Sequence, residues 1–77
     1  MKRGEALALL KELESTFETL KSTKWVLLKN DEREGLWELH IEWIPQTNEE
    51  LLLLDLSKKH NLEISFEDGQ TKFRRSK

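Results

Sequence analysis

The stretch 36–44, Leu-Trp-Glu-Leu-His-Ile-Glu-Trp-Ile, constrains the fold more than any other part of this chain, because its apolar and polar residues alternate. Successive side chains of a β-strand point to opposite faces of a sheet, so this alternation predicts a half-buried strand. The predicted inner set is Trp37, Leu39, Ile41 and Trp43, and the predicted outer set is Glu38, His40 and Glu42. Since the inner face must be covered, we expect any functional surface on the outer face or at the edges of the sheet.

A chain of 77 residues predicts one domain, 1–77. It contains no cysteine, which excludes disulfides and thiolate zinc sites, so the core must come from leucines, three Trp and three Phe. A cysteine-free chain suits a reducing compartment. No apolar run approaches the roughly 20 residues that cross a bilayer. We therefore expect a cytoplasmic protein that does not enter a membrane.

Charge is divided unevenly along the chain. Residues 4–71 hold seven Lys or Arg against all fifteen Asp and Glu, a formal charge of −8, whereas the two ends carry +6. Such a division bears on solubility and on the choice of partner rather than on the fold. We expect the basic ends, 1–4 and 75–77, to be frayed.

Two segments have the periodicity of helices. In 5–21 the apolar residues recur every three or four positions, which predicts an amphipathic helix. Thr47 and Glu50 have the spacing of a capping box, so we expect a second helix over 48–60 that ends at Asn61. Its core side is predicted to consist of Leu52, Leu53 and Leu56.

The segment 24–29 is predicted to pair with the alternating strand as a hairpin, through a polar turn at 30–35. The register stays open, because four consecutive apolar residues, 25–28, fit either face. If Leu28 lies opposite Trp37, Trp25 lies on the outer face beside His40. A slip of one residue places Val26 and Leu28 outside instead.

A second hairpin is predicted around Asp68-Gly69, a strong signal for a two-residue turn. Folding the chain there places Ile64 opposite Phe73 on one face, and Glu63 opposite Arg74 on the other. One pair is apolar and the other is oppositely charged, so both faces support this register.

The element order is therefore αββαββ. We predict an α+β, two-layer sandwich, in which a mainly antiparallel four-stranded sheet carries both helices on its aromatic face.

No catalytic or cofactor motif is present. The three glycines are too far apart for a phosphate-binding loop, and no serine lies in a nucleophile elbow. Glu38, His40 and Glu42 combine the residue types of a zinc site or an acid–base pair, but three residues of one straight strand rarely converge on one ion. We therefore expect no enzyme, no cofactor and no metal site. A metal-dependent enzyme around His40 ranks third, behind the two hypotheses that follow.

The leading hypothesis is a small non-catalytic interaction module that regulates or inhibits a macromolecular partner. Carboxylates predominate on the outer face, and Asp31, Glu32 and Glu34 in the first turn extend them, so the partner is expected to be a protein, and a basic one. Plain solubility explains the same charges. The candidate partner-binding residues are Trp25, Glu38, His40, Glu42, Glu63 and Glu67.

A nucleic-acid-binding module is the alternative, because cations can neutralise phosphates. The residues that would serve it are Lys2, Arg3, Lys72, Arg74, Arg75 and Lys77. The acidic body would repel a polyanion unless contact is confined to the ends. A homodimer through the outer face or an edge strand is also expected, since a small domain without disulfides buries additional apolar area when two copies associate.

Overall fold

The computed structural model describes residues 1–29 and 36–76. The order of its main elements is αββαββ, as predicted. They are α1 (Arg3–Thr16), β1 (Trp25–Lys29), β2 (Trp37–Ile41), α2 (Glu50–His60), β3 (Leu62–Glu67) and β4 (Gln70–Arg75). Two short 3₁₀ helices, η1 (Glu18–Leu20) and η2 (Thr47–Glu49), follow α1 and precede α2.

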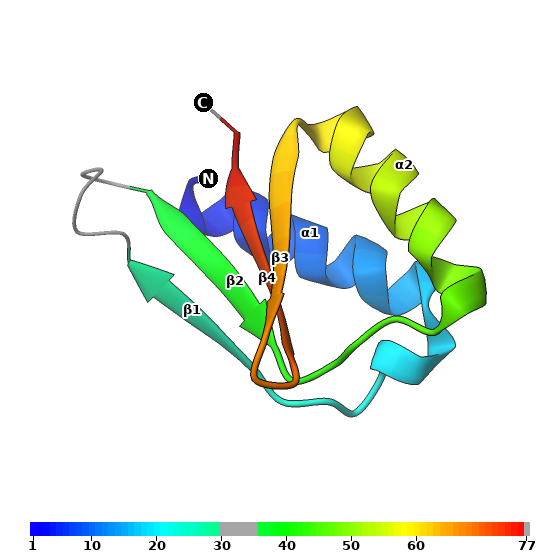
Figure 1. Ribbon diagram of the computed structural model, residues 1–77. Helices are drawn as coiled ribbons and strands as arrows, with labels where there is room; N and C mark the ends of the chain where they lie inside the picture. Colours follow the sequence, from blue (N-terminus) through cyan, green and yellow to red (C-terminus); the bar gives the residue numbers. More distant parts are fainter. Residues whose placement is uncertain (30–35, 77) are drawn as a thin grey trace.

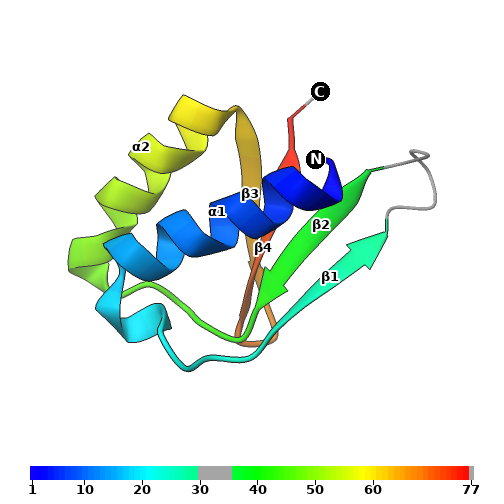
Figure 2. The same cartoon turned by 180° about the vertical axis from the view of Figure 1, so that it is seen from behind.

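The four strands form one sheet in the order β1-β2-β4-β3, and all neighbouring strands are antiparallel. Both helices lie on one face of this sheet, which Figure 1 shows in front of α1 and Figure 2 shows from the helix side. The opposite face carries no helix of residues 1–29 or 36–76. The predicted two-layer α+β sandwich is therefore confirmed, and its sheet is antiparallel throughout.

The core lies between the sheet and the helices. The inner side chains of the two central strands, Leu39, Ile41 and Phe73, are completely buried. Trp43, just after β2, is also buried, and its ring lies 5.2 Å from that of Phe17, centroid to centroid. Helix α1 buries Ala6, Leu9, Leu10 and Leu13, and α2 buries Leu53 and Leu56.

The first hairpin adopts the second of its two open registers. Trp25 lies opposite Ile41 and Leu27 opposite Leu39, so both belong to the inner face. Val26 and Leu28 therefore point outward. The placement of Trp25 on the outer face is wrong: its side chain is 46% exposed, but only because β1 is an edge strand at the margin of the helix layer.

The second hairpin has the predicted register, with Ile64 opposite Phe73 and Glu63 opposite Arg74. Its two turn residues have positive φ, 51° at Asp68 and 74° at Gly69. Two positive φ angles give the type I′ turn, whose twist matches that of antiparallel strands.

Helix α1 is shorter than the predicted helix 5–21. It ends at Thr16, and Phe17 has an extended backbone (φ −115°, ψ 107°). The hydroxyls of Ser15 and Thr16 both donate to the Glu12 carbonyl, so side chains compete for the groups that continue a helix. The break allows Phe17 to enter the core, where it is almost fully buried.

The start of α2 differs from the predicted capping box by one residue. The Glu49 carboxylate, rather than that of Glu50, accepts a hydrogen bond of 2.8 Å, from the Gln46 N–H. Leu52, predicted to be in the core, is 53% exposed. The predicted stop at Asn61 is confirmed, with a left-handed backbone (φ 54°).

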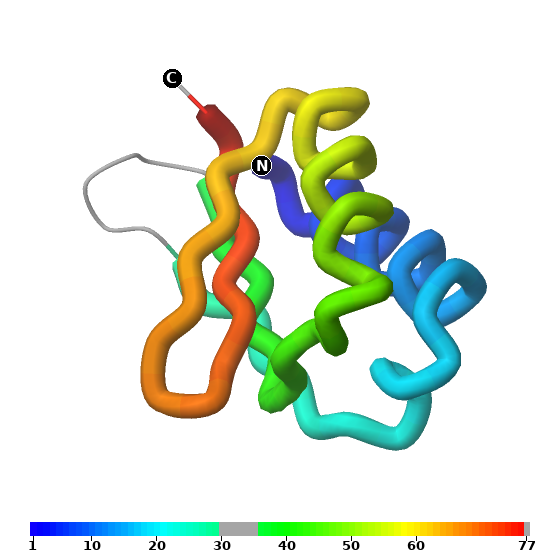
Figure 3. The backbone as a smooth tube through the Cα atoms, turned by 45° about the vertical axis from the view of Figure 1, so that its right-hand side comes forward, coloured from blue at the N-terminus to red at the C-terminus, as the bar shows by residue number. Residues whose placement is uncertain are grey.

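The chain ends were predicted to fray, and both contact the rest of the fold. Met1 is buried, and its carbonyl accepts a hydrogen bond of 2.6 Å from the Trp37 N–H. The Ser76 N–H donates to the Asn61 carbonyl. Figure 3 shows the N-terminus and the end of β4 at the same end of the sheet. Over the described residues both ends therefore make backbone hydrogen bonds to the rest of the fold, and fraying of the ends stays a prediction.

Candidate interaction surface on the outer sheet face

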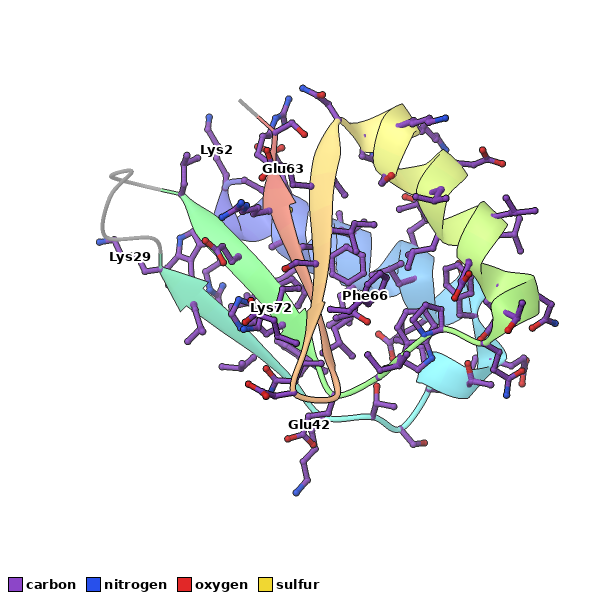
Figure 4. The ribbon with its side chains drawn as sticks, in the orientation of Figure 1. Lys2, Lys29, Glu42, Glu63, Phe66 and Lys72 are labelled. Carbon is purple, nitrogen blue, oxygen red and sulfur yellow. The ribbon has the colours of Figure 1, made fainter. Side chains whose placement is uncertain are left out.

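The outer face is the side of the sheet opposite the helices. Registers of the three strand pairs determine its members, because residues paired across strands share a face. Figure 4 shows Glu63 and Lys72 on one side of β3 and β4, and Phe66 on the other. The members of the outer face are Val26, Leu28, Glu38, His40, Glu63, Ser65, Glu67, Gln70, Lys72 and Arg74.

The β1 side of this face is apolar. Val26 is 44% exposed and Leu28 is 45% exposed, and they are adjacent on the same face of β1. Their cross-strand neighbours are His40 for Val26 and Glu38 for Leu28. The sequence prediction that two large apolar side chains accompany Glu38 and His40 is confirmed, but the pair is Val26 and Leu28 rather than one that includes Trp25.

Glu38 and His40 lie together, as their alternation predicted. The His40 Nε2 and the Glu38 Oε1 are 3.2 Å apart, and both side chains are partly buried. Glu42 follows β2 and is exposed, and its N–H donates to the Lys24 carbonyl. The strand ends at Ile41. Glu38 and His40 therefore form one local unit, and Glu42 lies beyond it.

The β3–β4 side of the face is charged and internally paired. Arg74 Nε–H donates to Glu63 Oε2 at 2.7 Å, and the Lys72 ammonium donates to Glu67 Oε2 at 2.8 Å. The hydrogen bond to Glu67, strengthened by its charge, raises the pKa of Lys72. The same hydrogen bond and the Lys72 charge lower the pKa of Glu67. Over the described residues the outer face is therefore a mixed surface with a modest acidic excess, and an apolar part on β1 accompanies it, whereas the sequence predicted an acidic, partly apolar face.

The basic residues proposed for nucleic acid divide between the outer face and the start of α1, where Arg75 meets Glu5. Lys72 and Arg74 lie on the outer face, each bonded to a carboxylate, whereas Arg75 donates to Glu5 of α1 at 2.7 Å. Lys2 and Arg3 lie at the start of α1 and are exposed. Three of the predictions fall outside the described residues: Lys77, the acidic turn with Asp31, Glu32 and Glu34, and the turn at 30–35 itself.

A second charged cluster, which the sequence did not predict, joins the two helices. His60 Nε2 lies 2.7 Å from Glu12 Oε2, and Lys59 donates to Glu12 Oε1 at 3.3 Å. Partial desolvation raises the pKa of Glu12, but the hydrogen bonds and charges of Lys59 and His60 outweigh it, so the pKa is lowered overall. The cluster borders a shallow groove of about 200 Å³ that Ala8, Leu9 and Leu62 also line. No local signal pairs residues 48 positions apart, and only the packing of α1 against α2 brings them together.

Two features bear on other classes of function. Among residues 1–29 and 36–76, no group of three or more histidines and carboxylates is placed to hold a metal ion. Within the same ranges, no helix has the length and apolar character needed to cross a membrane.

Comparison with known proteins finds no matching family model, no matching curated sequence and no matching solved structure.

Proposed function

We propose that this chain is a small non-catalytic interaction module of the cytoplasm, which regulates or inhibits a macromolecular partner through its outer sheet face. The observation that carries the proposal is the exposure of Val26 and Leu28 side by side on the outer face, which carries no helix of the described residues and is turned toward the viewer in Figure 1. Adjacent exposed apolar side chains with polar neighbours are typical of protein contact surfaces.

The chemistry around this apolar pair suits a protein partner with basic groups. Val26 and Leu28 supply a small apolar patch at the β1 edge of this face, and the charged residues of β2, β4 and β3 border it on one side. Many interfaces combine apolar and charged groups in this way. The outer strand positions hold three glutamates against one lysine and one arginine. An acidic excess steers a basic partner and accelerates its association. Small acidic inhibitors of nucleases and other DNA-binding proteins illustrate this kind of role by analogy.

The nucleic-acid alternative stays a prediction, and the geometry favours it less. A phosphate would have to compete with Glu67 for Lys72, with Glu63 for Arg74 and with Glu5 for Arg75. Binding to DNA or RNA at low salt that weakens steeply with added salt would support it.

The proposal is tested with the double variant Val26→Thr/Leu28→Thr. Threonine keeps the preference for a strand while it removes apolar contact area, so the fold should be retained. The control is Leu52→Gln, which removes an equally exposed apolar side chain from the helix layer. We expect affinity purification with the wild-type chain and the control to recover the same specific protein, and purification with the double variant to lose it. Recovery of no specific protein, or equal recovery by all three chains, would contradict the proposal.

A further inference from the structure

Strand β3 offers a free edge for backbone pairing. Among the described residues it is the last strand of the sheet, and its one neighbour there is β4 (Figure 1). The residues on either side of a two-residue turn, here Glu67 and Gln70, bond to each other through both backbone groups. In an antiparallel pair every second residue bonds in this way, so Ser65 and Glu63 also direct their backbone groups toward β4. The bond from the Ser76 N–H to the Asn61 carbonyl continues the same series. It follows that Leu62, Ile64 and Phe66 direct their N–H and C=O groups away from β4.

This edge lacks the usual protection against pairing. Proteins commonly shield an edge strand with lysine or proline. The other edge strand, β1, ends in Lys29 and follows Lys24, whereas Leu62–Glu67 contains no lysine, arginine or proline. The β3 edge is thus suited to accept another strand.

Apolar side chains line this edge on the helix side. Phe66 projects there from β3 (Figure 4) and is about half exposed, and Leu54 of α2 is 53% exposed. Between α2 and β3 lies a groove of about 390 Å³. It is lined on the helix side by Leu54, Ser57, Leu62 and Ile64, and it extends around the strand to Glu63, Ser65 and Arg74. A strand added to β3 would bring its own apolar side chains against this groove.

We propose that the occupant is β3 of a second copy of this chain, paired antiparallel about a two-fold axis at Ile64. This register places Leu62 opposite Phe66 of the partner subunit on the helix side. On the outer side it places Glu63 opposite Ser65 of the partner subunit, so no two like charges face each other. The two sheets then form one continuous sheet, and the outer faces of both copies lie on the same side.

Charge at the two ends of β3 favours this occupant over an unrelated peptide. The strand begins after the basic end of α2, where Lys58 precedes Lys59 and His60, the two partners of Glu12. It ends at Glu67, the partner of Lys72, and at Asp68. Antiparallel pairing about Ile64 brings the acidic end of each copy beside the basic end of the other. The strand is therefore complementary in charge to itself when reversed.

Ser65 provides the sharpest test, because its neighbours within the chain and across the proposed interface have opposite charge. Within the chain Ser65 lies opposite Lys72, so Ser65→Glu is compatible with folding. In the dimer the new carboxylate would face Glu63 of the partner subunit, at two symmetric places. By sedimentation over a concentration series, we expect Ser65→Glu to raise the dissociation constant of the dimer about tenfold, and Ser65→Lys to lower it or leave it unchanged.

A matched pair on α2 tests the helix side. Leu54 and Leu52 are equally exposed, 53% each, but only Leu54 borders the β3 groove. We expect Leu54→Glu to weaken the dimer strongly and Leu52→Glu to leave it nearly unchanged, while thermal melting of dilute samples reports the fold of each variant. Val26→Thr/Leu28→Thr should dimerise like the wild type, which separates this proposal from the function of the outer face.

The proposal would be overturned by a chain that stays monomeric at millimolar concentration, whether or not β3 then binds an extended peptide. It would also be overturned by a dimer that responds alike to Ser65→Glu and Ser65→Lys. A dimer that depends on Leu52, or on Val26 and Leu28, would place the interface elsewhere and would equally overturn it.

Discussion

At the scale of single residues, Thr71 shows how this small core satisfies a polar group. Its side chain is completely buried on the inner face, and its hydroxyl donates to the Trp43 carbonyl just after β2. The bond holds the end of β2 against β4, where Trp43 packs on Phe17. The Trp43 indole N–H in turn donates to the Thr19 hydroxyl at 2.9 Å.

Thr71→Val tests this bond, because valine has nearly the same shape but cannot donate. We expect a loss of about 1–3 kcal/mol in the free energy of unfolding, since a buried carbonyl loses its partner. Urea denaturation measures the loss, and Thr71→Ser, which keeps the hydroxyl, is the control. A valine variant as stable as the wild type would show that the Trp43 carbonyl does not depend on Thr71.

The lowered pKa of Glu12 predicts how the free energy of unfolding changes as the pH falls. Its pKa is lower in the folded chain than its ordinary value of 4.5, so protons bind the unfolded chain more readily. The stabilisation by its bonds to Lys59 and His60 is therefore present above about pH 4.5 and is lost as pH falls through the lowered pKa. We expect Glu12→Gln to cost about 0.5 kcal/mol at neutral pH and to reduce the loss of stability on acidification.

The measurement is a series of urea denaturation curves from pH 7 to acid. Glu14→Gln is a matched control, because Glu14 lies on the same helix and makes no salt bridge with a described residue. Equal dependence on pH in the wild type and the Glu12→Gln variant would mean that the helix-joining cluster contributes nothing to stability.

At the scale of elements, the two hairpins show what the sequence can and cannot specify. Asp68-Gly69 restricts the turn of the second hairpin, and the pairs on both faces agree with it, so its register was predictable. In the first hairpin the apolar run 25–28 has no period of two, and both registers bury two apolar residues. Only the packing of the edge strand against the helix layer decides between them.

Helix α2 poses the same problem, because 51–54 is a run of four leucines and each could face the core. The structure orients the helix so that Leu53 is 2% exposed and Leu52 is 53% exposed. We expect Leu53→Ala to cost about 2–5 kcal/mol and Leu52→Ala to cost less than about 0.5 kcal/mol, measured by denaturation. Similar losses for the two substitutions would mean that α2 faces the sheet in a different orientation.

At the scale of the whole molecule, the arrangement of layers directs attention to the outer face. The alternation in β2 was sufficient to predict that Glu38 and His40 share this face, because strand geometry alone determines it. The pairing of Glu67 with Lys72, five positions along the chain, depends on the hairpin and adds a cation to the expected acidic face. The bond between Glu12 and His60 depends on how two helices pack, which no local pattern records.

The most direct measurement of the proposed function is photocrosslinking from the outer face inside cells. A photoreactive residue replaces Leu28 in one chain and Leu52 in another, so the two probes lie on opposite layers and have similar exposure. We predict that the probe at position 28 crosslinks one specific macromolecular partner and that the probe at position 52 does not. Crosslinking of that partner from position 52 alone, or of none from position 28, would contradict the assignment of the outer face as the partner surface.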